Sequence, residues 1–113
     1  MLGEFEYLIL SAAAHLGEKA YGAAMREVIE TTGGRACSLG ALYTTLDRLE
    51  AKGLVETWIS APTPQRGGRA RRMVRVTGEG ALAAREFYEA VVRISRGTVW
   101  AESRRSRLAG DTA

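Results

Sequence analysis

A single cysteine, Cys37, occurs in the chain, so no intrachain disulfide can form, as is usual in a reducing cytosol. No run of apolar residues reaches the roughly 18 that a membrane-spanning helix needs. The first residues include Glu4 and Glu6 instead of the basic region of a signal peptide, so nothing indicates secretion. We therefore expect a cytoplasmic protein.

Residue patterns that carry catalysis or bind metals are also missing. The sequence shows no serine in a nucleophile elbow, no pairing of histidine with aspartate and no phosphate-binding glycine loop between a strand and a helix. Its one histidine, His15, lies in a mostly apolar stretch and is expected to be packed or at a boundary. One histidine and one cysteine make no metal-ligand cluster. We expect neither an enzyme nor a cofactor.

Acidic residues are absent from residues 66–75, although the chain as a whole has a net charge of only +3. Residues 1–60 carry a net charge of −3 and residues 61–113 a net charge of +6. Such a concentrated basic patch predicts an anionic partner, either nucleic acid or a membrane surface. The apolar residues beside it alternate as in strands and do not form a basic amphipathic helix, which favours nucleic acid over a membrane. The patch consists of Arg66, Arg69, Arg71, Arg72 and Arg75.

Hydrophobic spacing predicts four helices and one hairpin. The second helix, with Tyr21 on its apolar face, is stopped by Gly33 and Gly34, while Ser38 and Thr77 are expected to cap the third and fourth helices. The predicted fold is mainly α with a two-stranded β-wing, a winged helix-turn-helix with a carboxy-terminal dimerisation helix. We expect helices over 3–16, 21–32, 39–52 and 78–100, and strands over 54–60 and 71–77.

The third helix has two different sides. Leu42 and Leu46 face the core, and at about 100° per residue the opposite side carries mainly small residues and hydroxyls, with Tyr43 on a flank. A side with so little bulk lets the backbone approach the floor of a major groove. A winged helix used for protein contact would instead carry apolar anchors there. The outward positions are Gly40, Thr44, Asp47, Arg48 and Ala51.

The last helix has a wide apolar face that so small a core does not cover, which suggests dimerisation. We divide the chain into a DNA-binding domain over 1–77, a dimerisation helix over 78–103 and a flexible tail over 104–113. Trp58 and Trp100 fit either an inducer pocket or plain interface contacts. Cys37 is either a structural residue or a redox sensor. The predicted dimer interface comprises Phe5, Phe87, Tyr88, Val91, Val92, Ile94 and Trp100.

Four segments together resemble the PadR family of bacterial transcriptional regulators. They read LGEFEYLILSAAAHL, AYGAAMREVIE, SLGALYTTLDRLEAKGLVE and PTPQRGGRARRMVRVTGEGALAA. The resemblance implies a homodimer, usually a repressor, that binds pseudo-palindromic double-stranded DNA operators and pairs through its carboxy-terminal helix. Met73 and Val74 stand where the family wing often has an aromatic residue.

The family pattern also implies which residues touch DNA. The short carboxy-terminal part resembles the small members of the family, without a large inducer domain, although a small aromatic or hydrophobic inducer fits the prediction. To the positions carried over from the family we add Arg71, because it flanks the hairpin tip. The predicted DNA contacts are Ser38, Gly40, Ala41, Tyr43, Thr44, Arg48, Arg66, Gly68, Arg69 and Arg71.

Overall fold

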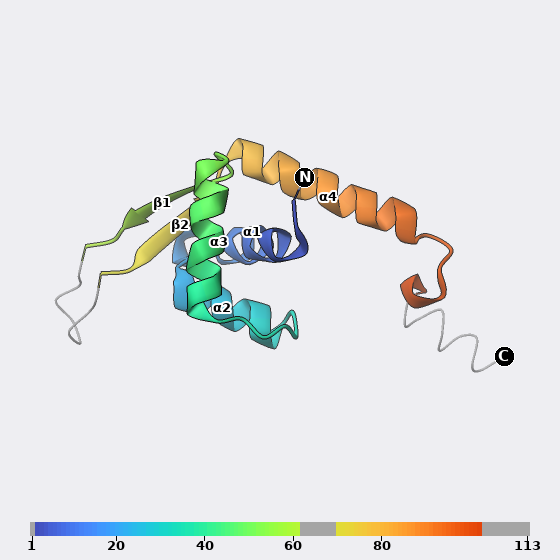
Figure 1. Cartoon of the computed structure of the whole chain (residues 1–113), viewed down its shortest axis with the longest axis horizontal. Helices are drawn as coiled ribbons and strands as arrows, with labels where there is room; N and C mark the ends of the chain where they lie inside the picture. Colours follow the sequence, from blue (N-terminus) through green and yellow to red (C-terminus); the bar gives the residue numbers. More distant parts are fainter. Residues whose placement is uncertain (1, 62–69, 103–113) are drawn as a thin grey trace.

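The computed structural model describes residues 2–61 and 70–102, and it confirms the mainly helical class with a two-stranded antiparallel sheet. Three helices form a cluster, the hairpin projects from one side of it, and the last helix leaves on the other side (Figure 1). The elements are α1 (Glu4–Leu16), η1 (Gly17–Lys19), α2 (Gly22–Thr31), α3 (Leu39–Ala51), β1 (Val55–Ile59), β2 (Arg72–Val76), α4 (Gly78–Ser95) and η3 (Val99–Ala101).

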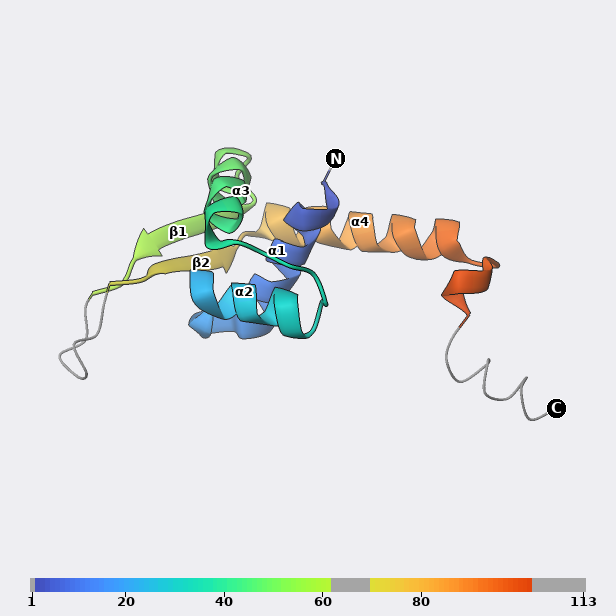
Figure 2. The same ribbon diagram turned by 60° about the horizontal axis from the view of Figure 1, so that its bottom comes forward.

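The hydrophobic core lies where α1, α2 and α3 meet the start of the sheet (Figure 2). The leucine stripe of α3 is buried, as its spacing predicts, and Val55 and Val74 bring both strands into the same cluster. This packing fixes which side of α3 faces outward. The largest fully buried side chains are those of Ile9, Leu10, Met25, Leu42, Leu46, Leu49, Val55 and Val74.

Both predicted helix caps are confirmed. The Ser38 hydroxyl accepts a hydrogen bond from the backbone N–H of Ala41 at 3.1 Å, and the Thr77 hydroxyl accepts one from Gly80 at 3.0 Å. The same Thr77 hydroxyl donates to the Gly53 carbonyl oxygen at 2.8 Å, which ties the start of α4 to the end of α3. Gly53 has a φ of +77°, a left-handed conformation that favours glycine just past a helix end.

The sheet pairs Val55 with Val76 at its core end and Ile59 with Arg72 at its outer end. Tyr21, which helical spacing places on the apolar face of the second helix, instead has extended backbone (φ −141°) and forms an isolated bridge with Met73. That prediction is wrong because β2 offers Tyr21 a backbone partner, and α2 begins only at Gly22.

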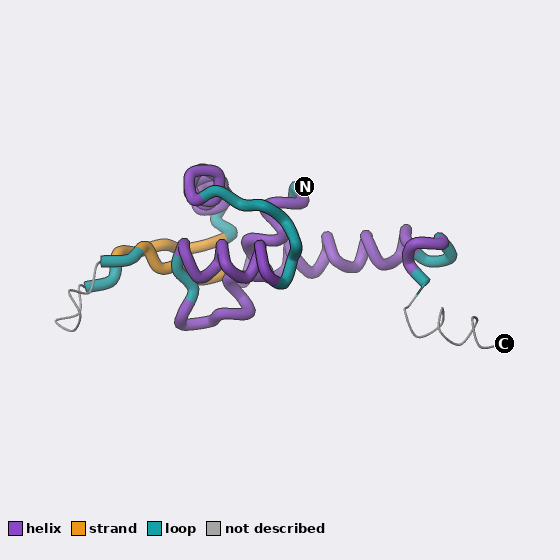
Figure 3. The backbone as a smooth tube through the Cα atoms, turned by 90° about the horizontal axis from the view of Figure 1, so that it is seen from below, coloured by secondary structure: helices purple, strands orange, loops and turns teal. Residues whose placement is uncertain are grey.

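The apolar stripe that predicts a helix through residue 100 is helical only as far as Ser95. Gly97 has a φ of +83°, and the Thr98 hydroxyl donates to the Ser95 carbonyl oxygen at 2.6 Å, so the chain turns before η3. α4 thus extends past the helical cluster and ends in this turn (Figure 3). Large apolar side chains on it stay exposed, Ile94 at 82% among them.

Candidate nucleic-acid interface

The outward side of α3 is exposed as the sequence predicts. Gly40, Ala41 and Thr44 are exposed near its amino-terminal end, and Arg48 is exposed one turn further along. Thr45 is buried, and its hydroxyl donates to the Ala41 carbonyl oxygen at 2.9 Å, so it is directed along the helix. The exposed surface therefore combines small residues and hydroxyls with the Arg48 guanidinium and the Asp47 carboxylate, which pairs with Arg72. Its small residues suit a helix that enters a groove.

Tyr43 is half-buried and packs against the first residue of α2. A Cβ atom added at Gly22 would lie 2.7 Å from Tyr43 Cζ and 2.9 Å from Cε1, both far inside normal contact. The missing side chain at Gly22 therefore gives the tyrosine ring its place on the flank of α3. The sequence reasoning missed Gly22, because it read the position only as part of a helix.

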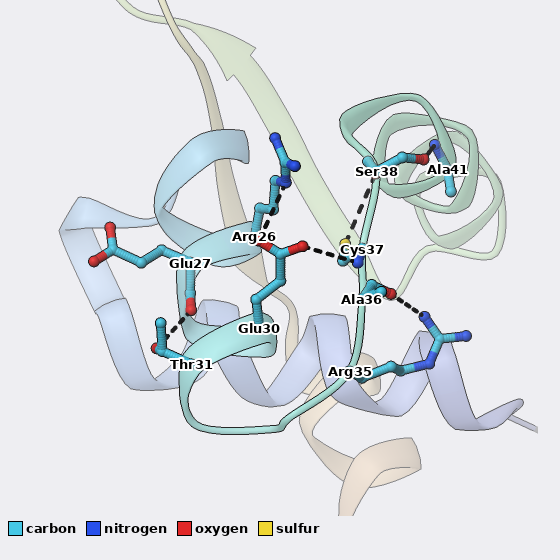
Figure 4. A network of polar contacts seen from close by, with 9 residues as sticks. All are labelled: Arg26, Glu27, Glu30, Thr31, Arg35, Ala36, Cys37, Ser38 and Ala41. Carbon is cyan, nitrogen blue, oxygen red and sulfur yellow. Dashed lines mark hydrogen bonds and ion pairs between the residues drawn. The ribbon is translucent and has the colours of Figure 1, made fainter.

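The loop before α3 is held by charged and polar contacts (Figure 4). Glu30 of α2 lies 3.5 Å from Arg26 Nε and accepts a hydrogen bond from the Cys37 backbone N–H at 3.2 Å. Cys37 is buried, and burial together with the negative charge of Glu30 raises the pKa of its thiol. A buried, protonated thiol is a poor redox sensor, which favours the structural interpretation of Cys37.

The arginines of the hairpin have different environments. Arg71 is exposed, and its guanidinium lies 4.2 Å from the centre of the Tyr21 ring. Arg72 is mostly buried between Asp47 and Glu50 of α3, whereas Arg75 pairs with Glu56 on the other face of the sheet. The prediction of an arginine run that no acid neutralises is wrong at Arg72 and Arg75, because the acids come from other elements. The predicted contacts Arg66, Gly68 and Arg69 lie outside the described residues.

The first turn of α1 contacts the carboxy-terminal end of α3 and, through Arg35, the loop before it. The Glu6 carboxylate is buried and accepts hydrogen bonds from Gly3 N–H at 2.8 Å and from Lys52 Nζ at 2.9 Å. Burial alone would raise the pKa of Glu6, but these two bonds and the charges of Lys52 and Arg48 outweigh it and lower that pKa. Near the other end, Arg35 pairs with Glu4 at 3.2 Å.

Residues predicted for dimerisation fall into two groups. Phe5 and Phe87 are half-buried within the chain itself: Arg35 covers the Phe5 ring, and Phe87 stacks on Tyr7 with ring centres 4.8 Å apart. The others lie along α4 and η3, where Val92 is half-buried and the rest are exposed. A groove of about 480 Å³ between Leu2 and α4 joins the two groups. The exposed members are Tyr88, Val91, Ile94 and Trp100.

The two tryptophans do not meet within one chain. Trp58 lines a cavity of about 520 Å³ between β2 and the end of α1. Trp100 belongs to η3, at the far end of α4 from the sheet (Figure 1). A pocket that contained both tryptophans would therefore need a second copy of the chain.

Comparisons with known proteins agree with this fold. A model of the transcriptional regulator PadR-like family matches residues 9–86. A PadR family transcription regulator from Clostridium difficile has a similar structure (TM-score 0.68, 23% identity), with 83% of this chain and 93% of that chain covered. RosR from H. salinarum is 27% identical (TM-score 0.64), with 98% of this chain and 90% of that chain covered.

No curated protein sequence matches the chain. Over the described parts of the chain, no helix is long and apolar enough to cross a membrane, and no three residues of His, Cys, Asp or Glu gather as metal ligands would.

Proposed function

The chain belongs to the PadR-like family of transcriptional regulators, and we propose that it is a homodimeric repressor that binds a pseudo-palindromic DNA operator in the cytoplasm of a bacterium. The observation that carries this proposal is the exposed side of α3, where small and hydroxyl residues lie beside an arginine-bearing hairpin. An enzyme would need a nucleophile, a base or a metal in a pocket, and the family is one of regulators.

In this function, α3 enters the major groove with its amino-terminal end foremost. Its exposed backbone at Gly40 and Ala41 approaches the base edges, and the hydroxyls of Ser38 and Thr44 contact phosphates. Arg48 reaches a phosphate or the edge of a guanine. Tyr43, seated on Gly22, places its hydroxyl on the sugar-phosphate backbone.

The hairpin supplies the second set of contacts. Arg71 is exposed beside the outer end of the strands and carries its charge to the DNA backbone, together with Arg66 and Arg69 of the tip and the peptide of Gly68. Arginine side chains of this kind follow phosphates or enter a narrow minor groove. Because each phosphate contact releases a counterion, operator affinity should fall steeply with salt.

Dimerisation supplies the two-fold symmetry of the operator. The apolar side chains of α4 that remain exposed are the kind of surface that a homodimer covers, and the groove beside Leu2 continues the same surface. Two heads held by paired α4 helices reach half-sites about 34 Å apart, one turn of DNA.

A small aromatic or hydrophobic inducer would release the operator by favouring another spacing of the two heads. The cavity beside Trp58 and the exposed Trp100 are the candidate contacts for such a molecule. The volume of the cavity is within the range of small-molecule sites.

Selection from random duplex DNA tests this function. We expect the protein to enrich an inverted repeat, and Arg48→Ala to weaken binding to it roughly tenfold or more in a mobility-shift titration. Arg93→Ala, which removes an equal charge from α4, is the matched control and should bind like the parent. Enrichment of no sequence would refute the proposal.

A further inference from the structure

One guanidinium joins the recognition helix to the wing. Arg72 Nη2 lies 2.9 Å from Asp47 Oδ1 and 3.4 Å from Glu50 Oε1, so a residue of β2 reaches two carboxylates of α3. Its side chain is only 21% exposed, although it belongs to the outer end of the strand. The two carboxylates more than compensate its charge, which makes it a poor contact for phosphate.

The same cluster includes the other strand. Glu50 Oε2 accepts hydrogen bonds from the Thr57 hydroxyl at 2.6 Å and from the Thr57 backbone N–H at 3.2 Å. Arg72 Nη2 also lies 3.4 Å from the Thr57 hydroxyl oxygen. Both strands are therefore bound to α3 by one polar cluster, which we call the wing clamp: Asp47, Glu50, Thr57 and Arg72.

The wing clamp acts on the outer end of the sheet, away from the apolar core. Apolar packing holds the core end of the sheet, where Val55 pairs with Val76 and is buried. The pair of Ile59 and Arg72 lies four residue steps further out, a distance of about 13 Å. The start of α2 also holds the outer half of the sheet, through the bridge between Tyr21 and Met73. The clamp is the polar contact that links this half to α3, and a small tilt at the core end would move the outer end by a larger distance.

The wing clamp contributes little to the stability of the fold. Asp47 is 69% exposed and Glu50 is 43% exposed, and ion pairs of this exposure contribute little to folding. A guanidinium shared by two carboxylates and a hydroxyl does, however, fix the orientation of the sheet relative to α3, because hydrogen bonds are directional and apolar contacts are not.

We propose that Arg72 is a positioning residue for DNA recognition: with Asp47, Glu50 and Thr57 it sets the angle between α3 and the wing, so that both reach the same operator at once. This inference rests on the proposed function. It assigns Arg72 a role within the protein and leaves phosphate contact to Arg66, Arg69 and Arg71.

Two variants with opposite changes of charge separate positioning from electrostatics. Arg72→Gln removes a positive charge, and Glu50→Ala removes a negative charge and the link to Thr57. Positioning predicts that both weaken operator binding roughly tenfold, while charge alone predicts that Glu50→Ala tightens it. Arg85→Gln and Glu89→Ala, which break an exposed pair on α4, are the matched controls and should bind like the parent.

The salt dependence of operator affinity gives a second readout. Loss of a phosphate contact lowers the slope of log affinity against log salt by about one, whereas loss of a positioning residue leaves the slope unchanged. A lowered slope for Arg72→Gln, or tighter binding by Glu50→Ala, would overturn the inference. So would full recovery of Arg72→Gln by Asp47→Asn, since Arg72 would then act only by neutralising Asp47.

A third measurement does not involve DNA. Backbone ¹⁵N order parameters should fall at Ile59 and Arg72 in both clamp variants and stay at parental values at Val55. Unchanged order parameters at Ile59 and Arg72 would show that the clamp does not hold the outer end of the sheet, whatever the DNA-binding results. Failure of the parent to select any operator would instead refute the proposed function and with it a role of the clamp in recognition.

Discussion

Replacing Gly80 by alanine should destabilise the protein, even though alanine favours helices. Gly80 is buried in the first turn of α4, where the helix crosses the end of α3 and the start of the sheet. A Cβ atom there would overlap the Leu54 carbonyl oxygen and lie 3.0 Å from both the Leu54 carbonyl carbon and Val76 Cγ1. Because the Leu54 carbonyl also accepts the Thr77 N–H at 3.1 Å, the obstacle is fixed backbone.

The expected loss follows from two opposing effects. Overpacking against backbone costs about 1–3 kcal/mol, and the exchange of glycine for alanine in a helix returns about 0.5–1 kcal/mol. Because the added atom would overlap a fixed backbone oxygen, the cost lies in the upper part of its range. We therefore expect Gly80→Ala to lower the free energy of unfolding by roughly 1–2 kcal/mol, or the midpoint temperature by roughly 4–12 °C. Gly78→Ala lies two residues earlier, where no atom stands within 4 Å, and should leave the midpoint unchanged or slightly raised.

Thermal unfolding followed by circular dichroism compares the two variants with the parent. All three proteins must be measured at one concentration, because the proposed dimer would make the midpoint depend on concentration. Equal midpoints for Gly80→Ala and Gly78→Ala would show that α4 can move away from Leu54 at no cost. The packing described for this crossing would then be refuted.

Four further experiments test other parts of the molecule. Gly22→Ala should push Tyr43 from its place, weakening operator binding several-fold in a mobility-shift titration with a small change in midpoint temperature. Val91→Glu should give monomers in light scattering, because it puts a charge in the apolar face of α4. Cys37 should react with a thiol reagent only on unfolding, and fast reaction of the native protein would contradict its burial. Because its pKa is lowered, the Glu6 carboxylate stabilises the fold fully above the ordinary carboxyl pKa of 4.5, and this stabilisation is lost as the pH falls. The stability of Glu6→Gln should therefore decrease less steeply with falling pH than that of the parent.

Features set by neighbouring residues were predictable from the sequence. The leucine spacing of α3 determines its buried side, and Ser38 and Thr77 cap helices through bonds to residues three positions later. The hairpin and the apolar face of α4 follow from alternation and helical spacing in the same way. The outward side of the candidate interface was therefore visible before the fold was known.

Features that depend on residues far apart in the sequence were not predictable from it. The pairing of Arg72 with Asp47 joins residues 25 positions apart, and that of Lys52 with Glu6 joins residues 46 positions apart. A run of arginines therefore looked uniform in the sequence, although the fold neutralises some of its members and exposes others. Gly22 and Gly80 appeared as ordinary helical glycines, because the close approach of Tyr43 and Leu54 arises only from packing. The end of α4 at Ser95 depends on the backbone turn at Gly97.

Three charged contacts hold α3, and they differ in their sensitivity to salt. Glu4 with Arg35 is a largely exposed pair, whereas Arg72, which binds Asp47, is only 21% exposed and Glu6, which binds Lys52, is only 8% exposed. Salt screens exposed charges much more than buried ones. Rising salt should therefore loosen the loop that precedes α3 first, and the wing and the Lys52 end of α3 later. Part of any loss of operator affinity at high salt would then come from the protein's own geometry, in addition to the release of counterions from DNA.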